Sequence, residues 1–318
     1  MPCDALAIFR ALADPTRLRI FHLLRAMELA IGELAQVLGQ SQPRVSRHVK
    51  ILSDAGLAER RKEGSWVFLG LGDPACVTPL FGTIDAWDGE QGNAWTVADR
   101  ARLAAVRADR AAAAARYFAE HAEEWDAIRS LHVPESAVEA RIGEMLADAA
   151  IGRLVDIGTG TGRMIELFGG QAESVVGVDR SPEMLRLARA KFTEAGLIGV
   201  DLRQGDMYAL PLADGAADVV IIHQVLHFAQ QPAAAIAEAG RLLAAGGRLL
   251  VIDFASHDRE DLRTRDAHVR LGFGDDQIEA WFRAAGLALS RVEELVGEAL
   301  TVKLWMGSRA PRAALKVV

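Results

Sequence analysis

The stretch LVDIGTGTGR, residues 154–163, carries the clearest chemistry in the chain. An apolar run ends in Asp156, and Gly158, Gly160 and Gly162 then alternate with threonines. Glycine-rich loops hold nucleotide-type ligands, because a loop without side chains lets the backbone approach the ligand. A dinucleotide loop of the G-x-G-x-x-G type would need glycine where this chain has arginine or isoleucine, and a P-loop would need Gly-Lys followed by Ser or Thr. The spacing therefore disfavours both kinds of phosphate-binding loop.

Two later strand-like runs also end in acidic residues. VVGVD ends in Asp179, and RQGDM ends in Asp206 and Met207. A carboxylate at Asp179 can accept from both hydroxyls of a ribose, because a vicinal diol offers two donors. Asp206 can accept from an adenine amino group while Met207 packs on the ring. Core strands that end in incidental acids would not explain three acids at three consecutive strand ends.

From residue 151 onward, such strand-like runs alternate with amphipathic helices, which predicts an α/β fold with a parallel sheet. These features together resemble class I S-adenosylmethionine (SAM) methyltransferases of the methyltransferase type 11 kind. The likeness extends over about residues 115–308 and includes the runs ADVVIIHQVLHF and IAEAGRLLAAGGRLLVIDF. It implies a Rossmann-like fold with a seven-stranded sheet whose last strand is antiparallel. It also implies SAM as the cofactor, with the carboxylate of Asp156 serving its ammonium group directly or through water. The residues that this likeness places at the cofactor are Asp156, Gly158, Thr159, Gly160, Gly162, Asp179, Arg180, Asp206, Met207 and His223.

The acceptor side of the site is less specific. Methyl transfer is an in-line displacement, so the protein has mainly to align the acceptor and to remove a proton where necessary. His223 and His227 follow the fourth strand, and either is a candidate general base because imidazole titrates near neutrality. The alternative for each is a cofactor or packing contact. His268 and Arg270 lie in a late segment that can close an acceptor pocket.

The segment RYFAEHAEEWDAIRS, residues 116–130, resembles the helix that covers the cofactor in such methyltransferases. For each of its residues alone, an ordinary packing helix is an equally good interpretation. Missing features exclude some classes of methyl acceptor. The Asn/Asp-Pro-Pro-aromatic motif of DNA amino-methyltransferases is absent, which argues against a DNA base. Arsenite methylation needs several thiols, and the two cysteines lie in or near the N-terminal part of the chain. A small organic acceptor remains. The candidates for the lid are Tyr117, Phe118, His121, Trp125 and Asp126.

A different chemistry is predicted nearer the N-terminus. The net charge of −7 argues against a nucleic-acid partner, yet residues 41–62 gather basic side chains with few acids among them. In the predicted helix 42–55, Val45, Val49 and Leu52 share one face. A short helix precedes it and a basic hairpin follows it, which is typical of a helix-turn-helix with a wing. Such a helix enters the major groove while Lys and Arg neutralise phosphates. The alternative is a solvated basic helix in a small packing domain.

The tract from ALADPTRLRIFHLL to SRHVKILSDAGLAERRKEGSWVFLGL resembles the ArsR/SmtB family of winged-helix repressors. The likeness implies binding to a double-stranded DNA operator and a homodimer formed through the winged-helix domain. No metal site is expected, because ELAIGEL stands where many members have a Cys-x-Cys pair. A second family site would use His121 and Glu124, but Arg110 and Ala108 occupy its other positions. The residues implied to contact DNA are Gln42, Arg44, Ser46, Arg47 and Lys50 on the helix and Arg61 and Lys62 on the wing.

The expected organisation is a winged helix-turn-helix domain over residues 1–90, a helical linker over 91–114 and a methyltransferase domain over 115–310. Residues 73–95 are mixed in character, with several prolines and glycines, and DGEQGN (88–93) is expected to be a mobile linker. No apolar run is long enough to span a membrane, and no signal peptide is recognisable. Cys3 and Cys76 suit a reducing compartment, so a cytoplasmic protein is expected.

Two functions remain open. In the first, the chain is a DNA-binding transcription regulator fused to a SAM-dependent methyltransferase that acts on a small molecule. In the second, it is a repressor whose methyltransferase fold only senses SAM or S-adenosylhomocysteine. The sequence identifies neither the acceptor, nor the operator, nor the general base.

Overall fold

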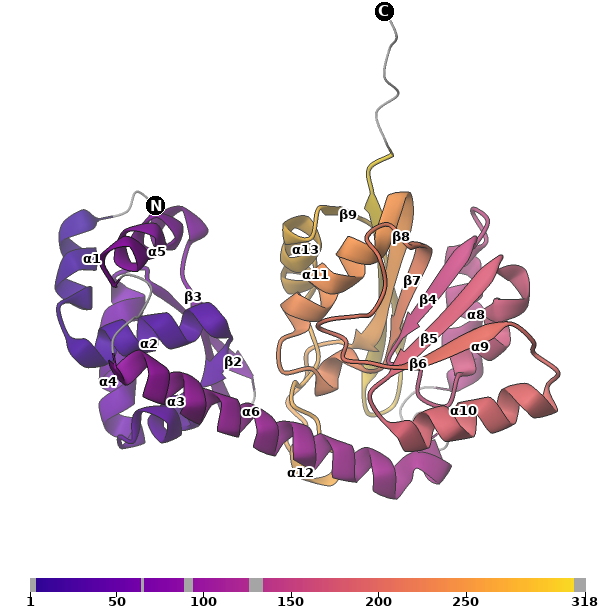
Figure 1. Cartoon of the computed structure of the whole chain (residues 1–318), viewed down its shortest axis with the longest axis horizontal. Helices are drawn as coiled ribbons and strands as arrows, with labels where there is room; N and C mark the ends of the chain where they lie inside the picture. Colours follow the sequence, from indigo (N-terminus) through magenta and orange to yellow (C-terminus); the bar gives the residue numbers. More distant parts are fainter. Residues whose placement is uncertain (1–3, 64–65, 89–93, 126–133, 312–318) are drawn as a thin grey trace, which may run out of the picture. The chain divides into compact units, whose positions relative to one another are not determined.

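The computed structural model describes the chain apart from residues 1–3, 64–65, 89–93, 126–133 and 312–318. It divides into two compact units, Met1–Ala113 and Ala114–Val318 (Figure 1). Helix α6, Ala94–His121, runs across the boundary between them. The domain limits expected from the sequence stay a prediction, and the part of the predicted helical linker that the structure describes lies in α6.

The first unit contains a helix-turn-helix and a small antiparallel sheet of order β1-β3-β2. Asp14 begins α2 as the Asp-Pro pattern predicts, since its Oδ1 accepts from the backbone N–H of Thr16 at 2.9 Å and of Arg17 at 3.0 Å. Helix α3 ends at Gly39, whose φ is +65°. The elements are α1 (Ala5–Leu12), α2 (Pro15–Ala26), β1 (Leu29–Ala30), α3 (Ile31–Leu38), α4 (Gln42–Asp54), β2 (Ala58–Glu63), β3 (Trp66–Leu71) and α5 (Pro74–Asp88).

Helix α5 lies in the segment after the wing, to which the sequence assigned no element. It is a continuous helix despite Pro79 in its interior. Val77, Phe81 and Ile84 recur at helical spacing and are buried in the core of the first unit. Phe81 stacks on Phe21 with 4.3 Å between the ring centroids, so core packing outweighs the proline. Cys76, on the same helix, is disulfide-bonded, which differs from the reduced thiol that the sequence predicts. Residues 89–93 of the expected mobile linker lie outside the described residues.

The second unit is built on one seven-stranded sheet of order β6-β5-β4-β7-β8-β10-β9. The first five strands in this order pair in parallel, and β10 is antiparallel to both β8 and β9. This confirms the predicted α/β fold with a seven-stranded sheet and an antiparallel last strand. The strands are β4 (Arg153–Ile157), β5 (Ser174–Asp179), β6 (Val200–Gln204), β7 (Ala217–His223), β8 (Leu243–Phe254), β9 (Leu287–Val296) and β10 (Thr301–Arg309).

Helices cover both faces of this sheet (Figure 1). On β7, Val219 and Ile221 face one core while Val220 and Ile222 face the other, because side chains alternate along a strand. The first core is completed by α8 (Glu135–Leu146), α9 (Arg163–Phe168) and α10 (Pro182–Glu194). The second core is completed by α11 (Pro232–Leu242) and α13 (Asp275–Ala284). None of the described helices is long and apolar enough to cross a membrane.

Candidate cofactor and DNA-binding sites

The glycine loop connects β4 to α9 and is held against the end of β5. The backbone N–H groups of Gly158 and Thr159 donate to the carbonyl oxygen of Val178 at 2.8 and 3.0 Å. Gly158, Gly160 and Gly162 have φ angles of +72°, +54° and +87°, a region that other residues rarely adopt. The alternating glycines therefore meet a backbone requirement of the loop.

Asp179, at the end of β5, joins the same loop. Its Oδ2 accepts from the backbone N–H of Gly160 at 2.8 Å, and its Oδ1 accepts from that of Ser181 at 2.8 Å. Burial raises the pKa of the Asp179 carboxyl, against the opposing effect of these backbone N–H groups. A carboxylate offers about four acceptor positions, so each oxygen keeps capacity for a further donor. Asp179, the residue predicted to bind a ribose, is thus in direct contact with the glycine loop.

Asp156 is buried and is turned toward the loop that follows it. Its Oδ2 accepts from the hydroxyl of Thr159 at 2.6 Å, and the whole residue is 1% exposed. Arg163, which stands where a dinucleotide loop has glycine, pairs with Glu139 of α8 through two hydrogen bonds of 2.5 and 2.8 Å. This fork raises the pKa of the Arg163 guanidinium. The sequence did not predict this partner, because α8 precedes the loop and no short motif links the two.

The end of β6 lies beside that of β5. The backbone N–H of Gly205 donates to the carbonyl oxygen of Asp179 at 3.0 Å. Asp206 is exposed, with its Oδ1 accepting from the backbone N–H of Tyr208 at 3.1 Å, and Met207 is half-buried. Arg180 is exposed beside Asp179. The structure thus brings the predicted adenine and ribose residues to one edge of the sheet, while their roles stay a prediction.

His223 and His227 lie at and just beyond the end of β7. His223 is 7% exposed, and its Nε2 lies 3.6 Å from Oε1 of Glu135 on α8. His227 is 2% exposed, and its Nδ1 lies 2.8 Å from Oδ1 of Asp253 at the end of β8. Asp253 was not predicted from the sequence as a site residue.

The segment between these histidines touches the glycine loop. A Cβ added at Gly158 would lie only 2.7 Å from the side chain of Val225. In open α/β sheets, ligands bind at the carboxyl ends of the strands. The acceptor-side candidates therefore lie at the same end of the sheet as the glycine loop.

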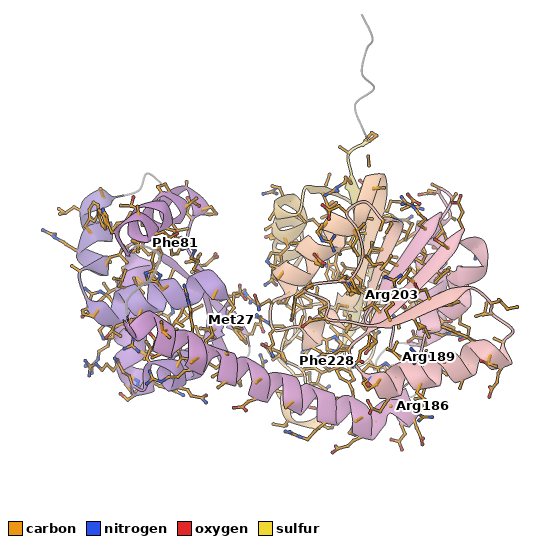
Figure 2. The ribbon with its side chains drawn as sticks, in the orientation of Figure 1. Met27, Phe81, Arg186, Arg189, Arg203 and Phe228 are labelled. Carbon is orange, nitrogen blue, oxygen red and sulfur yellow. The ribbon has the colours of Figure 1, made fainter. Side chains whose placement is uncertain are left out.

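Aromatic side chains cover this end of the sheet. Tyr117 and Phe118, at the end of α6, lie near Phe228 with centroid distances of 6.4 and 4.8 Å. Trp125 lies 5.9 Å from Phe228, and its Nε1 would be 3.6 Å from a Cβ added at Gly160. Figure 2 shows Phe228 on the side of the sheet where the last turns of α6 lie. Phe228 was not predicted, because it reads as one more apolar residue after a strand.

Two candidates for the lid, Tyr117 and His121, are in contact with each other. The ring of His121 stacks on that of Tyr117 with 4.4 Å between the ring centroids. Burial raises the pKa of Tyr117 to about 12, so its hydroxyl keeps its proton at neutral pH. His268 and Arg270 are buried, and the ring of His268 lies 4.2 Å from that of His227. Asp126, the remaining candidate for the lid, lies outside the described residues.

In the first unit, α4 presents its apolar face to the core and its polar face to solvent. Val45, Val49 and Leu52 are buried, as their spacing predicts. Lys50 forms an ion pair of 2.8 Å with Asp54, one turn further along the helix. Among the described residues, no group of three or more His, Cys, Asp or Glu side chains is arranged to hold a metal ion. The predicted DNA contacts that are exposed are Gln42, Arg44, Arg47, Lys50 and Lys62, whereas Ser46 is half-buried.

The wing differs from the prediction at Arg61 and adds Arg60 as a candidate DNA contact. Arg61 is half-buried and pairs with Glu28 at 2.7 Å and with Glu63. Its guanidinium is therefore engaged within the protein. Arg60 and Lys62 are both exposed and lie two residues apart on β2, so they share a face. Arg60 was missed, although the alternation along a strand could have indicated it.

Comparisons with known proteins agree with this division. A family model described as a methyltransferase domain matches residues 155–251, and one described as a helix-turn-helix domain matches residues 12–61. The chain is 41% identical over 87 residues to the arsenical resistance operon repressor of Escherichia coli K12, a match that covers 26% of this chain and 73% of the repressor. It is 37% identical over 116 residues to the demethylmenaquinone methyltransferase of Thermus thermophilus, covering 36% of this chain and 52% of that enzyme.

One solved structure shows the fold of the second unit. It is a SAM-dependent methyltransferase from Thermotoga maritima, described as a possible histamine N-methyltransferase, with a TM-score of 0.50 and 23% identity. The match covers 62% of this chain and 99% of that one. Of most curated relatives the chain spans between 40% and 58% of the length. The chain belongs to the ArsR-type helix-turn-helix repressors, and it joins that repressor-type domain to a methyltransferase domain.

Proposed function

We propose that this chain is a DNA-binding transcription regulator that also catalyses the SAM-dependent methylation of a small molecule. The observation that carries the catalytic part is the contact between Asp179 and the glycine loop, where Oδ2 accepts from Gly160 N–H at 2.8 Å. This contact brings the carboxylate of Asp179 beside the backbone of a glycine, which supports the proposed binding of a ribose there. It is the arrangement that a nucleoside with an amino-acid tail requires.

The residues present fit SAM in this proposal. The unused acceptor positions of Asp179 take the ribose hydroxyls, while Asp206 and Met207 contact the adenine. The backbone of Gly158, Thr159, Gly160 and Gly162 would hold the amino-acid part, and Asp156, Arg180 and His223 would complete the site. SAM, when bound, supplies a methyl group on a sulfonium that leaves readily. The chain itself has to hold the acceptor in line, exclude water and take up a proton.

The regulatory part of the proposal rests on α4 and the wing. We place the exposed Arg44, Arg47 and Lys50 of α4 in the major groove and on the phosphates, with Gln42 and Ser46 nearby and Lys62 on the wing. Because Arg61 pairs with Glu28 and Glu63, it has to exchange partners if it contacts DNA.

The DNA-bound form is proposed to be a homodimer formed through the winged-helix domain. It binds a double-stranded operator, which requires a cytoplasmic location.

A second candidate function is that of a repressor whose methyltransferase fold only senses SAM or S-adenosylhomocysteine. The observation that favours it is the continuity of α6. Leu103 and Val106 of this helix are buried in the first unit, while Tyr117 and Phe118 lie against Phe228 in the second. A shift of the lid on ligand binding would therefore act on a helix that belongs to both units.

Turnover separates these two functions. We would incubate the full chain with methyl-labelled SAM and a broad panel of small organic acceptors, and measure its affinity for the DNA upstream of its coding region with and without SAM. Transfer of label to a small molecule supports the methyltransferase. No transfer to any acceptor, together with DNA affinity that changes with SAM or S-adenosylhomocysteine, would favour the sensor.

A further inference from the structure

A buried hydrogen-bonded pair lies where β7 and β8 end. Asp253 is fully buried, and its Oδ1 accepts from His227 Nδ1 at 2.8 Å and from the backbone N–H of Phe254 at 2.8 Å. Its Oδ2 accepts from the backbone N–H of His227 at 3.1 Å. A carboxylate can only accept hydrogen bonds, and the two oxygens of Asp253 face three donors here. The imidazole therefore carries its proton on Nδ1, and Nε2, on the opposite edge of the ring, is the basic atom.

The backbone around this histidine is fixed as well. The carbonyl oxygen of His227 accepts from the backbone N–H groups of Val269 and Arg270 at 3.1 and 2.9 Å. The guanidinium of Arg270 in turn donates to the carbonyl oxygen of Gln230 at 3.0 Å. The segment with Val269 and Arg270 and the end of β8 thus hold His227 from two sides. Such support keeps a proton acceptor in one orientation, as a catalytic base requires.

The surroundings of the pair are aromatic. The ring of His227 lies 4.0 Å from Phe228, 5.0 Å from Phe254 and 4.2 Å from His268, measured between centroids. Phe228 is also in contact with Phe118 and lies 5.9 Å from Trp125, which reaches the glycine loop. These rings connect the cofactor loop to the histidine. Flat aromatic molecules pack well among such rings.

The acidity of the group that is methylated limits the chemical class of the acceptor further. A carboxylic acid is already ionised at neutral pH, and a thiol with a pKa of about 8.5 supplies thiolate by itself. A neutral amine loses its proton only after it has been methylated. A phenolic hydroxyl, with a pKa of about 10, is mostly protonated yet acidic enough to give its proton to imidazole during the transfer. It is the acceptor that gains most from a fixed histidine base.

We infer that His227 and Asp253 form a dyad that removes the proton of an aromatic hydroxyl group while it is methylated, an inference that rests on the proposed function. The acceptor O–H bond breaks and its proton moves to His227 Nε2. The freed oxygen forms a bond to the methyl carbon, and the electron pair of the broken C–S bond stays on sulfur, which loses its positive charge. His227 is the catalytic residue, and Asp253 is a positioning residue that stabilises the imidazolium. Water then takes the proton away.

The test uses the full chain with methyl-labelled SAM, catechol and 4-methylphenol as phenolic probes, and aniline and benzyl alcohol as comparisons. Asp253→Asn keeps the size of the side chain but removes the charge. We expect its plateau kcat with the phenols to fall about tenfold or more, with SAM affinity in calorimetry unchanged. The pH profile of kcat should also differ from that of the wild type, because asparagine cannot stabilise the imidazolium that forms during the transfer. Asp276→Asn, an exposed site on α13, is the matched control and should leave rate and profile unchanged.

Several other results would contradict the dyad or the proposed function. Transfer to aniline or benzyl alcohol but not to the phenols overturns the dyad, and so does an Asp253→Asn protein with normal rate and pH profile. Loss of SAM affinity together with rate would make the pair purely structural. If Asp253→Asn does not fold, His227→Gln decides, because a retained rate overturns the inference and a lost rate with normal SAM affinity supports it. SAM binding without transfer to any acceptor also overturns the inference, whereas failure to bind SAM refutes the proposed function itself.

Discussion

At the scale of single residues, the surroundings of Asp179 have two opposite effects on the protonation of its carboxyl group. Burial favours the neutral carboxyl and raises its pKa, whereas the N–H groups of Gly160 and Ser181 favour the carboxylate. In the free folded protein the proton is held more tightly than in the unfolded chain. The stability that protonated Asp179 contributes is therefore fully present below its pKa in the unfolded chain. It is lost as the pH rises through the raised pKa of the folded protein. A ribose diol donates two hydrogen bonds and would favour the charged form.

This opposition predicts that SAM affinity depends on pH. As the pH falls below the raised pKa of Asp179, the affinity should fall by up to about tenfold per pH unit, because the proton competes with the ribose. Calorimetric titrations from neutral pH down to the onset of acid unfolding would measure this. Asp179→Asn should bind weakly with no such dependence. The assignment would be contradicted if the wild-type affinity were constant over this range.

At the scale of elements, the glycine loop depends on positions that have no room for a side chain. Gly162 has φ +87°, and a Cβ there would lie 2.3 Å from the ring of Phe192. Gly162→Ala should lower the free energy of unfolding by about 2–4 kcal/mol, from backbone strain and overpacking. Urea denaturation measures the loss. Gly170→Ala, with an ordinary φ and nothing within 4 Å, is the control, and equal stability of the two variants would disprove this packing argument.

The recognition helix gives a second prediction at this scale. Arg47 is exposed on α4, opposite the buried Val45 and Val49. Arg47→Ala should weaken binding to the DNA upstream of the coding region by about tenfold in a mobility-shift titration, because a charge-assisted contact is lost. Arg186→Ala, exposed on α10 in the other unit, should bind as the wild type does. Unchanged binding by Arg47→Ala would remove this residue from the recognition surface.

The sequence predicted the elements whose signals are local. The Asp-Pro start of α2, the alternating glycines and the apolar strand-like runs each follow from short-range rules. The parallel sheet follows from the alternation of these runs with helices. It missed contacts between distant segments. His227 and Asp253 are 26 positions apart, and nothing local marks them as a pair. Helix α5 was missed because Pro79 weighs against a helix locally, whereas its buried face is specified by the whole core.

At the scale of the whole molecule, two functions have to share one chain. Within the first unit, α1 buries Ile8 and Ala11 while Leu6 and Phe9 on the same helix are each 59% exposed. We expect the second copy of the chain to cover these side chains in the homodimer. The long helix α6 has residues in both units.

Phe9→Glu should therefore convert the dimer to a monomer at micromolar concentration, because a charge would be buried in an apolar contact. Sedimentation velocity gives the oligomeric state. Ile198→Glu changes a side chain that is 96% exposed in the second unit and should leave the dimer intact. If the wild type is monomeric, or if Phe9→Glu stays dimeric, this face is not the interface.

Both the proposed function and the dyad require that the second unit binds SAM through the glycine loop and Asp179. Calorimetric titration of SAM, and separately of NAD, into the wild-type chain and Asp179→Ala tests it directly. We predict one SAM per chain, no binding of NAD, and affinity for SAM lowered at least about tenfold in Asp179→Ala, because two hydrogen bonds to a charged acceptor are lost. Absence of SAM binding to the wild type, or equal affinity in the two proteins, would contradict the claim.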